Sequence, residues 1–138
     1  MLNNQDAALF PLRIKTKPVL CLWDTGAQVC LMSRRMVAKL QAKLDPIQGD
    51  PVKIKGIGEG FISPKFTTTV PIKFDDGVAR PAMFYICDQV PHEILLGMDF
   101  MSAYKIGFVP CGATDDTQIQ LWCNGKVIAC NQILENFY

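Results

Sequence analysis

Alternation of apolar and polar positions is the clearest pattern in this chain. Between residues 66 and 74, every large apolar side chain occupies an even position, from Phe66 to Phe74. This period of two is typical of a strand with one buried face. An Asp-Asp-Gly turn follows at 75–77, and residues 78–87 return as a second strand. The pair predicts a β-hairpin.

A second hairpin is predicted near the end of the chain. Residues 118–123 and 126–130 flank Asn124 and Gly125, the dipeptide that best tolerates the positive φ angles of a tight turn. Short strands separated by turn residues therefore dominate the chain, which predicts an all-β fold.

Two segments have helical rather than strand spacing. Ser33 is a suitable N-cap for a helix whose apolar stripe repeats every four residues from Met36 to Leu44 and closes before Pro46. A second, shorter helix is predicted over residues 98–104. We expect one or two short helices in a mostly β protein.

Length and composition predict a single domain. With 138 residues, of which 49% are hydrophobic, the chain can bury a core and still leave apolar surface for a partner. Residues 1–10 are expected to be a loose leader, and residues 11–138 one domain.

Charge and cysteine spacing exclude several functions. Fourteen basic and thirteen acidic residues leave a net charge of +1, so nucleic acid is not an expected partner. No apolar run is long enough to cross a bilayer and no signal peptide is visible, so no membrane partner is expected. Six cysteines without a Cys-x-x-Cys pair, and a lone histidine, His92, predict free thiols; a zinc or redox protein is the weakest interpretation.

The segment with the most chemical information begins with the apolar residues 19–23. This run leads directly into Asp24, Thr25, Gly26 and Ala27. Taken alone, Asp-Thr-Gly can be an ordinary turn after a strand.

Three motifs in order make the chain resemble the retroviral and long-terminal-repeat retrotransposon aspartic proteases, over roughly residues 12–123. They are the strand that enters Asp24, a glycine-rich hairpin near residues 53–62, and the block EILLGMDF at 93–100. The resemblance implies a retropepsin-like closed β-barrel or sandwich subunit that forms a symmetric homodimer. It also implies an aspartic endopeptidase without a cofactor, acting on peptide segments of a retroelement or viral polyprotein in the cytoplasm or in a virus or virus-like particle.

The same resemblance implies a set of site residues. Asp24 is the catalytic residue, supported by Thr25, Gly26 and Ala27; the substrate-binding flap is Gly56, Ile57, Gly58, Glu59 and Gly60; and the structural motif is Leu95, Leu96, Gly97 and Asp99. Asp99 is expected to make a cap or structural hydrogen bond rather than to act as a second catalytic acid. Trp23 is expected to anchor the core.

The second carboxylate of an aspartic protease must come from another copy. This sequence has one Asp-Thr-Gly and no second one, and a C2 dimer would place Asp24 opposite its own image. About thirty residues follow the second helix, so the dimer interface is expected to use other strands than in the simplest retroviral enzymes.

Several alternatives remain open at this point. The glycine-rich segment could be a passive surface hairpin, and Glu59 a solvated charge or a group that repels acidic substrates. Phe10 and Pro11 form either a self-processing site or the approach to the first strand. The whole chain could instead be a catalytically silent retropepsin-like dimerisation or binding module, in a capsid polyprotein or as a ubiquitin-pathway adaptor.

Overall fold

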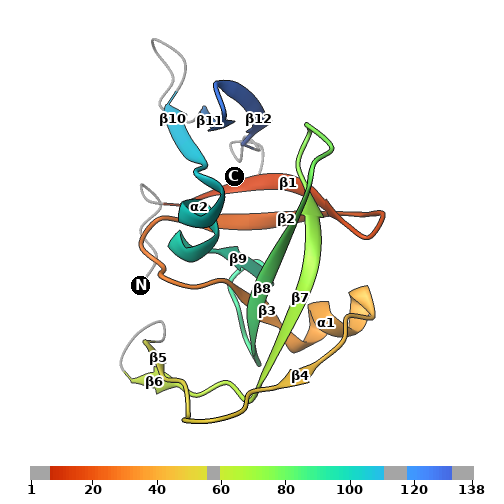
Figure 1. The fold of residues 1–138 in the computed structure, drawn as a ribbon, viewed down its shortest axis with the longest axis vertical. Helices are drawn as coiled ribbons and strands as arrows, with labels where there is room; N and C mark the ends of the chain where they lie inside the picture. The colour runs from red at the N-terminus through yellow and green to blue at the C-terminus, as the bar shows by residue number, and fades with distance from the viewer. Residues whose placement is uncertain (1–6, 56–59, 111–117, 132–138) are drawn as a thin grey trace, which may run out of the picture.

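The computed structural model describes residues 7–55, 60–110 and 118–131. Its main body is a β-barrel (Figure 1). The strands around it, in order, are β1 (Ala7–Ile14), β2 (Lys17–Asp24), β9 (Ile94–Leu96), β3 (Leu31–Ser33), β8 (Ala79–Cys87) and β7 (Phe66–Lys73). Pairing of β1 with β7 at Arg13 and Ile14 closes the barrel, and β4 (Asp45–Pro46) adds to the outer part of β7. The predicted mostly β, closed-barrel fold is confirmed.

The alternating pattern explains how the barrel fills. On β7, Thr68, Val70 and Ile72 point inward, and the residues between them are exposed. β8 pairs with β7 from Ala79 opposite Lys73 to Tyr85 opposite Thr67, so the predicted hairpin is confirmed. Phe10 and Trp23 meet edge to face in the same core, which confirms Trp23 as a core anchor.

Both predicted helices are present. α2 (Met98–Tyr104) matches its prediction. α1 (Arg34–Leu40) begins as predicted, because the Ser33 hydroxyl accepts a hydrogen bond from the Met36 amide at 3.0 Å. Neither helix has the length or hydropathy to cross a membrane.

The predicted end of α1 was wrong. The helix stops at Leu40 because Gln41 adopts a left-handed conformation, with φ of 53°. Two lysines then satisfy its last carbonyls: Lys15 Nζ, in the β1–β2 turn, donates to Leu40 O at 3.0 Å, and Lys17 Nζ, at the start of β2, donates to Lys39 O at 2.8 Å. Leu44 is therefore outside the helix and exposed.

The leader predicted over residues 1–10 is also wrong for its last four residues. Ala7 to Phe10 form the first half of β1 and pair with β2, from Ala7 opposite Asp24 to Phe10 opposite Cys21. Phe10 is fully buried. The bond between Phe10 and Pro11 thus lies inside a paired strand, and its cleavage would require β1 to open. Residues 1–6 lie outside the described part.

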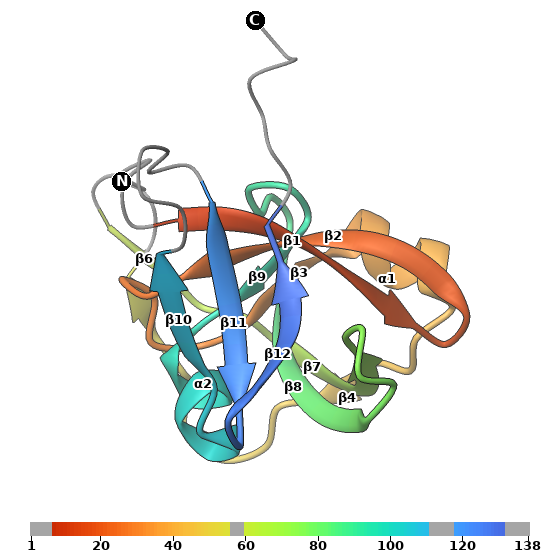
Figure 2. The ribbon, with the colours of Figure 1, turned by 90° about the horizontal axis from the view of Figure 1, so that it is seen from above.

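A separate three-stranded sheet follows α2. It consists of β10 (Gly107–Pro110), β11 (Ile119–Cys123) and β12 (Lys126–Cys130) and lies against one side of the barrel (Figure 2). The turn at Asn124 and Gly125 has φ angles of 53° and 75°, which confirms the predicted terminal hairpin. Leu121 and Ile128 join the barrel core.

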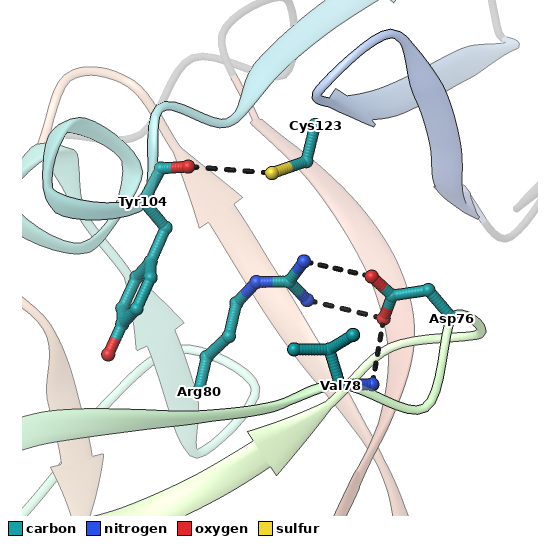
Figure 3. A network of polar contacts seen from close by, with 5 residues as sticks. All are labelled: Asp76, Val78, Arg80, Tyr104 and Cys123. Atoms are coloured by element: carbon teal, nitrogen blue, oxygen red, sulfur yellow. Dashed lines mark hydrogen bonds and ion pairs between the residues drawn. The ribbon is translucent and has the colours of Figure 1, made fainter.

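A partly buried ion pair lies where this sheet meets the barrel (Figure 3). Arg80 on β8 holds Asp76 with two hydrogen bonds, of 3.2 and 2.8 Å. Above it, the Cys123 thiol of β11 donates to the carbonyl of Tyr104 at 3.5 Å, and Asp75 N donates to Ile128 O at 2.9 Å. The turn between β7 and β8 therefore holds the terminal sheet in place.

Candidate active site

Asp24 is the last residue of β2 and is almost completely buried, at 3% exposure. Its Oδ1 accepts a hydrogen bond from the Gly26 amide at 2.9 Å, and its carbonyl accepts one from the Ala27 amide at 3.2 Å. A Cβ on Gly26 would lie 3.3 Å from Asp24 Oδ1, so glycine allows the tight approach. Thr25 is half-buried beside them. The four residues predicted as the catalytic turn do form one turn.

Along the strands around Asp24, successive side chains point alternately into the barrel and to the other face of the sheet. Phe10, Trp23 and Leu96 point into the barrel, while their neighbours point to the other face of the sheet. There Leu9, Leu22, Leu95 and Leu31 stand in register across β1, β2, β9 and β3. Two structural residues of the sequence motif thus have different roles: Leu96 fills the core and Leu95 forms part of this outer row.

The outer row belongs to a second apolar cluster. Cys87 and Val90 complete its buried part, and Ala27 and Ile62 pack against it. It joins the catalytic turn to the base of the glycine-rich hairpin. Leu9, Cys87 and Val90 were missed by the sequence interpretation, because they come from distant segments that only the fold brings together.

The start of α2 clamps the catalytic turn. Met98 N donates to Ala27 O at 2.8 Å, and Asp99 N donates to Gln28 O at 3.0 Å. Gly97 is packed so closely that a Cβ would lie 2.4 Å from Val29 O, which explains the glycine of the downstream motif.

Asp99 makes the structural hydrogen bonds predicted for it. Its Oδ1 accepts from Phe100 N at 2.7 Å and from the Cys30 thiol at 3.2 Å. The residue that caps α2 is Gly97, without a side-chain bond, so Asp99 acts from within the first turn of the helix. Cys30 was given no role by the sequence, since only the fold places it beside Asp99.

The arms of the glycine-rich hairpin are present. β5 (Ile54–Lys55) pairs antiparallel with β6 (Phe61–Ile62), and Phe61 is 71% exposed. Gly60 has φ of 101°, a conformation that favours glycine. The remaining predicted flap residues, Gly56, Ile57, Gly58 and Glu59, lie outside the described residues.

The described cysteines are free thiols, as predicted. Burial raises the pKa of Cys21 to about 12, so this thiol is a core residue rather than a nucleophile. Within the described ranges, no three cysteine, histidine, aspartate or glutamate side chains are grouped as a metal site would need.

Three solved structures of similar fold come from retroviral proteins or are retroviral-protease-like. The retroviral protease-like domain of Ddi1 from Leishmania major has 18% sequence identity and a TM-score of 0.63, with 96% of both chains covered. EIAV protease complexed with the inhibitor HBY-793 has 23% identity and a TM-score of 0.56, with 75% of this chain and 92% of that chain covered. The foamy viral protease-reverse transcriptase has 16% identity and a TM-score of 0.51, with 72% of this chain and 12% of that chain covered. These likenesses concern the fold.

Two comparisons concern the sequence rather than the fold. No curated protein matches it. The sequence model of the aspartyl proteases, however, matches residues 10–100, a range that contains the Asp24 turn, the arms of the glycine-rich hairpin and the start of α2. The chain therefore belongs to the aspartyl protease family, with a retropepsin-like fold.

Proposed function

We propose that this protein is an aspartic endopeptidase that works as a homodimer, with one Asp24 carboxylate from each subunit. The observation that carries the proposal is the buried Asp24 at the end of β2, held by the Gly26 amide in the Asp-Thr-Gly turn of an aspartyl protease family member. Polyprotein segments of a retroelement or virus are the proposed substrates, in the cytoplasm or in a particle.

The burial of Asp24 supports the need for a second subunit. An isolated carboxylate is costly to bury unless it is paired or amply hydrogen-bonded. Among the described residues, the one hydrogen bond to the Asp24 carboxylate comes from Gly26. A second Asp24 across a two-fold axis would supply the missing partner through a shared proton.

Such a pair provides both groups that peptide hydrolysis requires. Two carboxyls about 3 Å apart cannot both ionise, so the pair holds one proton between them. The carboxylate then takes a proton from the attacking water, and the carboxylic acid protonates the scissile carbonyl. Because one proton must be held by the pair, activity is expected to be highest in mild acid.

The outer edge of β10, which pairs with no strand of the described residues, is the proposed place of contact between subunits. β10 is an edge strand of the terminal sheet, and it carries Phe108 and Val109 at 44% and 45% exposure. An exposed apolar edge strand is prone to pair with another chain. Pairing of β10 with its own copy would satisfy the main-chain groups of both edges and continue the sheet across the two-fold axis.

The apolar cluster beside Asp24 is the proposed contact for substrate side chains. Ala27, Leu31 and Ile62 lie at its partly exposed rim, between the catalytic turn and the flap base. An extended peptide placed there would bury apolar side chains on one face. We therefore propose a preference for apolar residues next to the cleaved bond, with the hairpin of β5 and β6 acting as the flap.

A catalytically silent binding module is the second candidate. Its support is the likeness to a retroviral protease-like domain of Ddi1 over 96% of both chains. The test is cleavage of a mixed peptide library at about pH 5 by wild type and Asp24→Ala at several protein concentrations. Cleavage that needs Asp24 and rises faster than linearly with concentration supports the peptidase. No cleavage by a folded wild-type dimer would support the silent module.

A further inference from the structure

The Cys30 thiol lies where the catalytic loop meets the first turn of α2. It is buried, with Sγ 3.2 Å from Asp99 Oδ1 and 3.4 Å from the Gly97 nitrogen. Burial, reinforced by the Asp99 carboxylate, raises the pKa of this thiol. It therefore stays protonated, donates to Asp99 and accepts from the Gly97 amide.

We propose that Cys30 and Asp99 are positioning residues that hold the turn carrying Asp24 at a fixed place relative to α2. This inference rests on the proposed peptidase function. Neither side chain has a described contact with Asp24, so both would act through the loop between residues 26 and 30.

The links around the loop show why the thiol matters. Main-chain bonds fix its first part, from Met98 N to Ala27 O and from Asp99 N to Gln28 O. The far end, at residue 30, is tied to α2 by the thiol. Asp99 in turn is held by the Phe100 amide, so the carboxylate presents a fixed acceptor. The loop is thus attached at both ends to one rigid element.

Loss of this attachment should lower the rate of chemistry more than substrate binding. A misplacement of about 1 Å can cost roughly 100-fold in rate. We expect Cys30→Ala to lower kcat about tenfold with KM changed by less than about twofold. Cys30→Ser retains a donor and should restore kcat to within about threefold of wild type. Asp99→Ala and Asp99→Asn form a second pair of variants: we expect Asp99→Ala to lower kcat more than Asp99→Asn, which keeps an acceptor oxygen.

Cys21→Ala is the matched control. Cys21 is also a buried cysteine of the same core, on β2 three residues before Asp24, but among the described residues its thiol has no hydrogen bond to α2 or to Gly97. The control should lower the melting temperature as much as Cys30→Ala does, while kcat stays within about twofold of wild type. Equal losses of kcat in both alanine variants would reduce Cys30 to a packing residue and overturn the proposal.

Amide hydrogen exchange separates this inference from the peptidase itself. Exchange at Gly26 and Ala27 reports local opening of the turn, and it should be faster in Cys30→Ala than in wild type or Cys21→Ala. If wild type cleaves nothing, the peptidase proposal fails, and the exchange rates still decide whether Cys30 holds the turn. Unchanged exchange in Cys30→Ala would refute that role.

Discussion

Replacement of Gly97 by alanine is the sharpest test of how α2 holds the catalytic turn. Gly97 has φ of −109°, a conformation that alanine adopts freely, so backbone strain is not the issue. The added methyl would instead lie 2.4 Å from Val29 O and 2.9 Å from Ala27 O. Ordinary contacts between carbon and oxygen are well above 3 Å, so the loop and the helix must separate by roughly 0.6–1 Å.

The cost follows from this movement. Overpacking of a tight site costs about 1–3 kcal/mol, and weakening the bonds from Met98 N to Ala27 O and from Asp99 N to Gln28 O adds about 1 kcal/mol. The sum, about 3 kcal/mol, should lower the melting temperature by about 10 °C. Because the turn carries Asp24, kcat should fall by roughly 10- to 100-fold.

Thermal unfolding and peptide cleavage measure the two effects. Gly107→Ala is the control for stability, since a Cβ there meets no atom within 4 Å and should change the unfolding free energy by less than about 0.5 kcal/mol. A Gly97→Ala protein that melts within about 2 °C of wild type and cleaves at the same rate would refute the clamp.

Two further predictions concern stability. Pairing with Arg80 lowers the pKa of Asp76, so the ion pair stabilises the fold fully above the usual carboxyl pKa of 3.8, and this stabilisation is lost as pH falls through the lower pKa of the folded protein. Asp76→Asn should therefore lose less stability on acidification than wild type, as measured by thermal unfolding between pH 6 and pH 2. Ser33→Ala removes the N-cap of α1 and should cost about 1 kcal/mol, whereas Ser33→Asp, which keeps an acceptor, should cost less in the same unfolding assay.

Local signals predicted the elements well. The hairpin turn at Asn124 and Gly125 and the helix start at Ser33 depend on neighbouring residues, and both are present. The helix end at Gln41 was missed because the donors that stabilise it come from Lys15 and Lys17 on another element.

The candidate site likewise has a part that the sequence predicts and a part that depends on the fold. Asp24 and Gly26 lie two residues apart, so their turn could be recognised from the sequence. The bond between Cys30 and Asp99 joins residues 69 positions apart, and no periodicity points to it. The row from Leu9 to Leu31 likewise depends on strand register across four strands, which the sequence pattern leaves undetermined.

Mixing of wild type with Asp24→Asn, at constant total protein, tests the central claim most directly. If each active site uses one Asp24 from each subunit, random pairing of equal amounts leaves about one quarter of the dimers with two carboxylates. Cleavage at about pH 5 should then fall to about one quarter of the wild-type rate. A fall to about one half, in proportion to the wild-type fraction, would mean that each chain acts alone and would contradict the shared site.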